Sequence, residues 1–286
     1  MARRRIFEIS SAKMAPGILG RCRLCISVGL RDVQVAVLEG RKECHLLESH
    51  VLGDVRTLRG RMDAVQALFD EHLYLKAGYW AKVSVSFKSH KFALIPRAYY
   101  DPKTAPHYLS MNSFLRLEQE GIYAHYSPKG DFVNVFATEK KMVLWIRSLY
   151  PKLKPLITHQ ATPFVRGAIF SQGKQKNHAL YALLDGRILH LTLLRGGKLL
   201  FYNQFAIRSK HDMIKYTTLV LREWKVPEKQ TPFILFGDFS PPQLSAIRSH
   251  FPRARPGDRR KLLHFSYHFD EIPEHKYFDV LSFSLF

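Results

Sequence analysis

One order of expected elements occurs twice along the chain, and this repetition restricts the possible folds more than any other feature. Three short runs rich in aliphatic residues, 23–30, 33–40 and 43–52, alternate with turn candidates, and a helix capped by Asp54 is expected over 54–74. From residue 177 the same order returns in the runs 177–184, 187–194 and 198–207, followed by an expected helix over 210–224. Strands and helices then alternate in both halves. The pattern predicts an α/β fold in which each half is a three-strand meander followed by alternating helices and strands.

The boundaries follow from this order: a first half over residues 1–170 and a second half with a C-terminal tail over residues 171–286. The first half contains an irregular excursion at about 97–121, rich in Pro, Tyr and Asn, and then a hairpin that turns at 128–130. In the second half the remaining elements are a strand over 231–236, a helix over 241–251 and a strand over 262–267. The amphipathic end, residues 277–286, is expected to pack on the second half.

Composition narrows the class of protein. Of the 286 residues, 46% are hydrophobic, enough to build a core in each of two domains. No uncharged apolar run is long enough to span a membrane, and the basic start lacks the continuous apolar stretch of a secretory signal. With only 3 cysteines a disulfide framework is not expected, so the sequence favours a cytoplasmic protein.

The charge balance points to an anionic partner. The 44 Lys and Arg residues against 24 Asp and Glu give a net charge of +20, which attracts nucleic acid, anionic lipid or an acidic protein. The densest basic group is a candidate anion-binding set: Arg253, Arg255, Arg259, Arg260 and Lys261. Charge gives affinity without identifying the ligand, so RNA, an acidic protein and an unspecific basic surface all stay open.

Six stretches carry a resemblance to known proteins: 92–100, 107–112, 150–165, 180–205, 236–241 and 273–281. Together they resemble the Bacteroidetes family of bacterial proteins designated DUF3822. This resemblance implies a duplicated ribonuclease-H-like (actin-like) two-domain fold, that of the actin-like ATPase superfamily, with a cleft between the halves. A broader likeness to pilus and secretion assembly platforms of the same superfamily is one of fold alone.

An actin-like ATPase needs an acid at the end of the first strand of each half, to hold Mg²⁺, and glycine-rich loops around the phosphates. The first half has Gly29 in this region and no acid, because Asp32 comes later, where turn bonding is expected of it. In the second half Asp185 and Gly186 lie at the corresponding hairpin, where a two-residue turn also explains them.

The loop after the strand over 231–236 carries Gly237 and Asp238, where ATPases usually have two glycines. A carboxylate at the second position repels phosphate, although it could also accept from a ribose hydroxyl; capping of the next helix is the simpler role. The candidate cofactor-binding positions are Gly29, Asp185, Gly186, Gly237 and Asp238. No cofactor is expected, and ATP with Mg²⁺ is the alternative.

Other chemistry has little support. Ribonuclease-type hydrolysis needs several carboxylates around two metal ions, the first from the same strand that lacks an acid. Cys22 and Cys25 form a C-x-x-C pair without a second pair, and the acids and histidines of 268–279 have no recognised ligand spacing, so no metal site is expected. His159 is expected to serve the structure of a strand-to-helix junction.

The sequence therefore favours a non-catalytic actin-like protein that acts as a binding or assembly module for an anionic partner. The alternative is a nucleotide-binding actin-like ATPase with altered phosphate loops. A second alternative, suggested by the family resemblance, is an RNA-binding protein linked to ribosomal RNA. The partner and the oligomeric state stay open.

Overall fold

The computed structural model describes residues 4–10, 16–55, 57–127 and 131–286, so the expected turn at 128–130 lies outside the described residues. The chain divides into two compact units, which are described separately below. The first unit comprises Met1–Pro163, Leu263–Glu271 and Asp279–Phe286, and the second comprises Phe164–Leu262 and Ile272–Phe278. The chain thus enters the second unit at Phe164, and its C-terminal tail contributes to both units.

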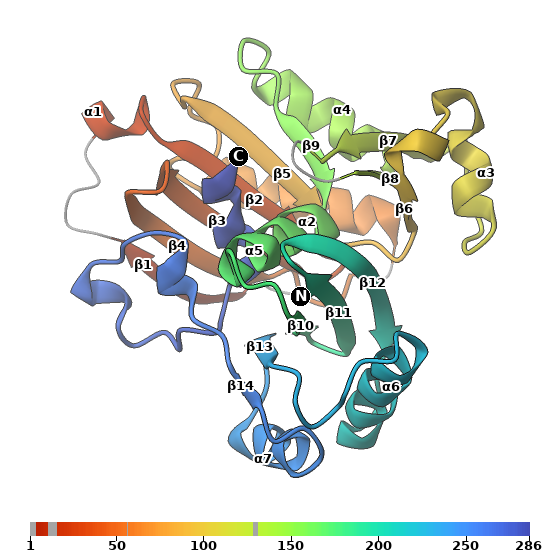
Figure 1. The fold of residues 1–286 in the computed structure, drawn as a ribbon. Coiled ribbons are helices and arrows are strands. Elements are labelled where there is room, and N and C mark those ends of the chain that lie inside the picture. The colour runs from red at the N-terminus through yellow and green to blue at the C-terminus, as the bar shows by residue number, and fades with distance from the viewer. Residues whose placement is uncertain (1–3, 11–15, 56, 128–130) are drawn as a thin grey trace. The chain divides into compact units, whose positions relative to one another are not determined.

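A six-stranded sheet forms the centre of the first unit (Figure 1). Its strands, in the order β1-β4-β3-β2-β5-β9, are β1 Arg4–Ser10, β4 Glu43–Val51, β3 Asp32–Glu39, β2 Arg23–Val28, β5 Lys82–Phe87 and β9 Leu156–His159. The β2-β3-β4 meander is antiparallel, whereas β5 and β9 continue the sheet in parallel. Parallel neighbours require a crossover: a helix precedes β5, and the connection from β5 to β9 contains further strands and helices. The antiparallel strand β1, which precedes the short helix α1 (Pro16–Leu19), was not predicted.

Two helices of the first unit contact each other through aromatic rings. Phe69 of α2 (Leu58–Glu71) and Trp145 of α4 (Lys140–Leu149) meet edge to face at 4.8 Å. The predicted helix start at Asp54 is wrong: α2 begins at Leu58, and the N-cap is Thr57, whose hydroxyl accepts from the Gly60 amide.

A small three-stranded sheet, β6-β8-β7, completes the first unit. Its strands are β6 Phe92–Pro96, β8 Phe132–Glu139 and β7 Glu120–Tyr126. Between β6 and β7 the chain forms short helical turns and the helix α3 (Ala105–Ser110), which packs against β8 and lies in the middle of this segment instead of at its end.

The second unit repeats the mixed pattern of the first. Its sheet has the order β12-β11-β10-β13-β14, with strands β12 Lys198–Ala206, β11 Ile188–Arg195, β10 His178–Asp185, β13 Phe233–Gly237 and β14 Ala254–Pro256. Strands β10 to β12 form an antiparallel meander, and β13 and β14 are added in parallel. The duplicated plan predicted from the sequence is confirmed.

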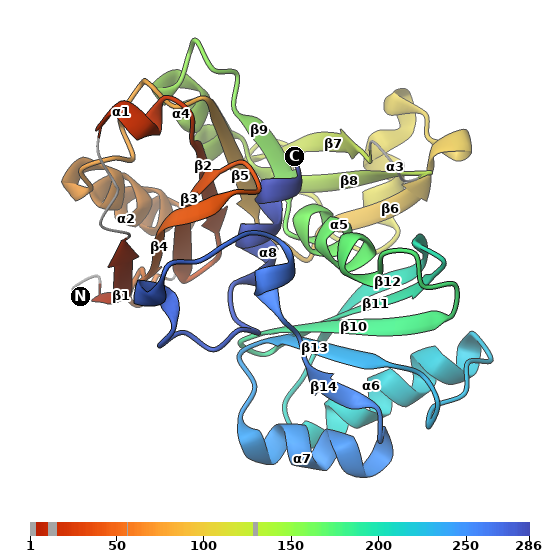
Figure 2. The ribbon, with the colours of Figure 1, turned by 60° about the vertical axis from the view of Figure 1, so that its left-hand side comes forward.

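Helices cover this second sheet on both faces (Figure 2). Residues from three strands, such as Leu180, Leu191 and Leu235, belong to one core. This core also includes residues of α6 (Lys210–Glu223) and α7 (Pro241–His250). The opposite face carries Phe236, which stacks on Phe278, and α5 (Ala161–Gln172), whose Phe164 also meets Phe278. Burial on both faces explains why β10 and β13 are near-continuous apolar runs.

The C-terminal region differs from the prediction. The strand expected over 262–267 does not form: these residues make turns and a single bridge between Glu43 and His264. The last segment, with α8 Phe278–Leu281, was expected on the second half, but Asp279–Phe286 belongs to the first unit. There the carbonyl of Phe286 accepts from Arg23 at 2.6 Å, and Asp279 accepts from Gln160 at 2.8 Å. None of the helices in the described ranges is long and apolar enough to cross a membrane.

Candidate functional site

The end of strand β2 is where an actin-like ATPase would present its metal-binding acid. Gly29 follows this strand, and a Cβ added to it would overlap the carboxylate of Asp32, the first residue of β3. The structure therefore brings Asp32 into the space that a side chain at position 29 would take. The sequence assigned Asp32 to turn bonding and did not foresee this placement.

Lys88, at the end of the neighbouring strand β5, neutralises this carboxylate. Its ammonium donates to Asp32 Oδ2 at 2.5 Å, and the lysine side chain is only 10% exposed. A metal ion at this position would meet a largely buried positive charge, and displacing that charge would break the ion pair. The acid at the end of β2 is thus already partnered within the unit.

The hairpin between β10 and β11 contains the other expected acid. The expected turn of Asp185 and Gly186 is wrong by one residue: Asp185 ends β10 and pairs with Ile188 across the hairpin, and Gly186 and Arg187 form its two-residue turn. Gly186 has φ of 58°, the positive value that the first central residue of a type II′ turn requires. The turn geometry accounts for the glycine without a ligand.

Gly237 ends β13 and is enclosed by backbone. Its φ is 91°, and a Cβ added to it would overlap the backbone of Leu184 on β10. Its N–H donates to the carbonyl of His275 at 2.8 Å, and its own carbonyl lies 2.9 Å from His275 Nδ1, which donates to it. His275 in turn stacks on Phe239 with ring centroids 4.1 Å apart.

The neighbouring side chain is held in the same way. Asp238 Oδ1 lies 3.0 Å from the ammonium of Lys276, and the Asp238 amide donates to the Leu184 carbonyl. Burial lowers the pKa of His275, although its bond to Gly237 acts in the opposite direction, so the ring is neutral at physiological pH. The tail segment Ile272–Phe278 therefore forms hydrogen bonds and an ion pair with the loop at Gly237 and Asp238.

The predicted anion-binding residues separate into two groups. Arg253, Arg255 and Lys261 line a cavity of about 540 Å³ beside Tyr181 and Phe236. Arg259 is 2% exposed and donates to the Pro273 carbonyl, while Arg260 pairs with Glu274 at 2.9 Å. The first group faces solvent, and the second holds the tail segment in place.

This cavity combines cations with a phenol. Burial raises the pKa of Tyr181 to about 12, although the charge of Arg255 acts against this, so the hydroxyl stays protonated at neutral pH. Arg255 and Lys261 form no ion pair with any acid that the structure describes, whereas Arg253 donates to the Gln230 carbonyl. Asp258 also lines the cavity and reduces its net positive charge.

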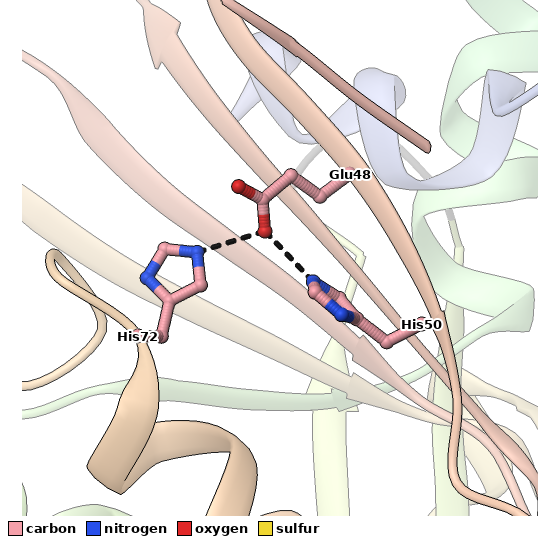
Figure 3. A group of neighbouring side chains, drawn as sticks. All are labelled: Glu48, His50 and His72. Carbon is pink, nitrogen blue, oxygen red and sulfur yellow. Dashed lines mark hydrogen bonds and ion pairs between the residues drawn. The ribbon is translucent and has the colours of Figure 1, made fainter. Parts of the chain in front are cut away.

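A buried carboxylate between two imidazoles was missed at the sequence level (Figure 3). Glu48 and His50 lie on one face of β4, because they are two residues apart, and His72 follows the last turn of α2. Glu48 Oε2 is 2.7 Å from His50 Nε2 and 2.8 Å from His72 Nε2, and Glu48 is 2% exposed. The donor types and their mutual distances of at most 4.8 Å would suit a divalent metal ion.

The hydrogen-bond geometry of this cluster favours imidazole N–H donors over a bound metal ion. The Tyr74 amide donates to His72 Nδ1 at 3.1 Å, so the neutral ring carries its proton on Nε2, toward Glu48. Ligand atoms around a tetrahedral zinc ion would lie about 3.4 Å apart, whereas these contacts have hydrogen-bond lengths. Burial acts to raise the pKa of Glu48, but the hydrogen bonds and charges of both histidines lower it to about 2. Glu48 is therefore a buried anion with two imidazole donors.

The remaining polar candidates serve the structure. Cys22 and Cys25 are fully buried, and burial raises the pKa of Cys22 to about 11 and that of Cys25 further, which disfavours thiolate chemistry. His159 is also fully buried: its Nε2 donates to the Ser89 carbonyl at 2.8 Å and its Nδ1 accepts from the Ala161 amide. Burial lowers its pKa to about 4, so it stays neutral.

Comparison with known proteins supports the family and the fold. Residues 11–248 match the family described as "Protein of unknown function (DUF3822)". A Bacteroides thetaiotaomicron VPI-5482 protein described as having an actin-like ATPase fold and unknown function is similar in structure, with a TM-score of 0.78 and 16% identity. The match covers 96% of this chain and 99% of that one. None of the curated proteins matches this sequence.

The type IV pilus biogenesis complex PilM-PilN provides a second structural match. Its TM-score is 0.57 with 14% identity, and the match covers 92% of this chain and 97% of that one. These identities support a common fold and no more. The actin-like fold expected from the sequence is confirmed.

Proposed function

We propose that the chain, which belongs to the DUF3822 family and has the actin-like fold, is a non-catalytic binding or assembly module for an anionic partner. One observation carries the proposal. In the loop of Gly237 and Asp238, the Gly237 carbonyl is hydrogen-bonded to His275 and the Asp238 carboxylate is paired with Lys276, both of the same unit. Asp32 is likewise paired with Lys88. Within each unit, the candidate polar groups therefore already have partners from the same unit.

The anionic character of the partner follows from charge. A net charge of +20 attracts anions and speeds their encounter with the protein. The PilM-PilN complex is a precedent for this fold in a complex with another protein. A cytoplasmic location is part of the proposal.

The alternative of a nucleotide-binding protein with altered phosphate loops has one observation in its favour. The carboxylate of Asp32 lies beside Gly29 at the end of β2, and loss of the Lys88 ammonium would leave it available to Mg²⁺. This alternative requires Lys88 to move away when nucleotide binds.

Calorimetry with Mg-ATP separates the two candidates. We expect no saturable heat for the wild type or for Lys88→Met, which keeps the length of the side chain without its charge. Saturable binding to the wild type that is lost in Asp32→Asn and in Asp185→Ala would refute the non-catalytic proposal. RNA binding, the third candidate, is tested with a short oligonucleotide at several salt concentrations, where a flat response would exclude an electrostatic mechanism.

A further inference from the structure

A groove of about 1090 Å³ opens on the first unit. Four segments contribute to it: the turn after β2, the start of α2, the segment before β7 and the start of α4. Its volume exceeds the range of about 300–1,000 Å³ that is usual for small-molecule pockets. It therefore has room for a segment of polypeptide.

The charge of the groove is predominantly positive. Six of the lining residues are cationic: Arg31, Arg59, Arg61, Arg116, Lys140 and Lys141. The lining contains three acids, Asp63, Glu118 and Glu139. Because Glu139 is bound by Arg61 at 2.6 Å in a buried pair, this acid does not offset the exposed cations.

The exposed cations are available for a ligand. Arg31, Arg59, Arg116 and Lys141 all lie on the surface, and none of them forms an ion pair with an acid in the described ranges. Lys140 differs, since its ammonium donates to the Leu117 carbonyl at 2.6 Å. Four unpaired cations around one groove favour a partner that brings several negative charges.

Apolar side chains lie exposed at the same place. Leu30 is 60% exposed and Leu58 is 38% exposed, and both line the groove. The segment that supplies Arg116 also carries Phe114 and Leu117, which lie outside the groove lining and are 80% and 52% exposed. Large apolar side chains exposed beside unpaired charges are typical of a protein interaction site.

We propose that this groove binds an acidic segment of another protein, in which leucine-like side chains alternate with carboxylates. The proposal rests on the anionic partner of the proposed function and specifies it. The carboxylates pair with Arg31, Arg59 and Lys141, and the apolar side chains cover Leu30 and Leu58. The start of α2 adds a favourable dipole for negative charge.

An acidic protein suits this groove better than RNA does. The described residues that line it include no aromatic side chain on which a base could stack, and stacking is the main sequence-tolerant contact of single-stranded RNA. Exposed Glu118 and Asp63 also repel phosphates, and the exposed leucines have no group that could donate to a phosphate oxygen. A peptide can place an apolar or neutral residue beside each of these acids.

The test measures fluorescence anisotropy of a labelled twelve-residue peptide of alternating Glu and Leu against the full chain. We expect saturable binding that weakens with added salt. The double variant Arg59→Glu with Lys141→Glu should weaken binding at least tenfold, as should Leu58→Ser, while the matched control Lys152→Glu, an exposed reversal in the same unit, should change it less than twofold. Circular dichroism melting checks that each variant is folded.

Several outcomes would overturn the proposal. These are no saturable binding of the peptide, equal effects of the groove reversals and of Lys152→Glu, or equal affinity for a peptide with Ser in place of Leu. Oligo(U) binding that is lost in the groove reversals would assign the groove to RNA while leaving the anionic partner in place. Mg-ATP binding, in contrast, would refute the proposed function without affecting peptide binding to this groove.

Discussion

Protonating Glu48 should remove a defined part of the stability of the first unit. Its pKa is about 2 in the folded protein against 4.5 for an ordinary glutamate, because hydrogen bonds and charges of His50 and His72 outweigh its burial. A pKa that is lowered on folding stabilises the fold above the unfolded value, and the contribution disappears as the pH falls toward the folded value. The full contribution is about 3 kcal/mol.

The pH window follows from the same two values. Of this free energy of unfolding, about 1 kcal/mol is lost by pH 4 and about 2 kcal/mol by pH 3. In Glu48→Gln the side chain has no charge to lose. The stability difference between wild type and Glu48→Gln should therefore shrink by these amounts between about pH 5 and pH 3. Other carboxylates cancel because both proteins contain them.

The assay needs a signal from the first unit alone. The chain has 3 tryptophans, of which Trp80 and Trp145 belong to the first unit and Trp224 to the second. Urea unfolding followed by fluorescence in a Trp224→Phe background reports the first unit. The control is Glu118→Gln, an exposed carboxylate of the same unit, whose stability difference from wild type should not vary with pH in this way. A Glu48→Gln difference that stays unchanged from pH 7 to pH 3 would refute the reasoning.

Three further predictions concern other parts of the molecule. Zinc at ten times the protein concentration should leave the melting temperature unchanged. His72 Nδ1 accepts from the Tyr74 amide, so the neutral ring carries its proton on Nε2 and offers no lone pair on the side of Glu48. Stoichiometric zinc in equilibrium dialysis, lost in His72→Ala, would contradict this. Gly237→Ala should lower the free energy of unfolding by about 3 kcal/mol or more, because backbone strain and overlap with the Leu184 backbone add. Gly186→Ala has a positive φ but open space around it, so it should cost about 1 kcal/mol. Similar melting temperatures for the two variants would show the overlap to be unimportant. Arg61→Met should lower the free energy of unfolding in urea by about 3 kcal/mol or more, because it leaves Glu139 buried and unpaired. Adding Glu139→Gln to Arg61→Met should recover part of this loss. A double variant less stable than Arg61→Met alone would disprove the coupling.

The fold was predictable from the sequence because its strongest signals are local. The meander strands of both halves are apolar runs bounded by turn residues, and such runs identify strands without knowledge of their partners. Boundaries were harder to predict. Asp54 and Thr57 are both good capping residues, and only the folded chain shows that Thr57 caps α2. Residues 262–267 look like a strand by composition, yet they pair at a single bridge.

The site contacts depend on residues far apart in sequence. Asp32 and Lys88 are 56 residues apart, and Gly237 and His275 are 38 apart, so no local pattern reveals either pair. The positions Gly29 and Gly237 were recognised, but their partners were not. For Glu48 the alternation with His50 on one strand was a usable signal, whereas His72 from the end of a helix was not. The two roles of the basic run 253–261 also emerge only once Arg259 is seen to be buried.

The way the tail is divided between the units has a consequence for experiments that cut the molecule. The chain passes from one unit to the other after Pro163, and again near residues 262, 271 and 278. Cleavage at the first crossing alone leaves the units covalently joined through the tail. A fragment ending at residue 262 would lose His275 from one unit and the C-terminal Phe286, which bonds Arg23, from the other. A continuous stretch that contains either half alone therefore lacks tail residues that pack in its own unit. To study one unit by itself, these tail residues have to be fused to it.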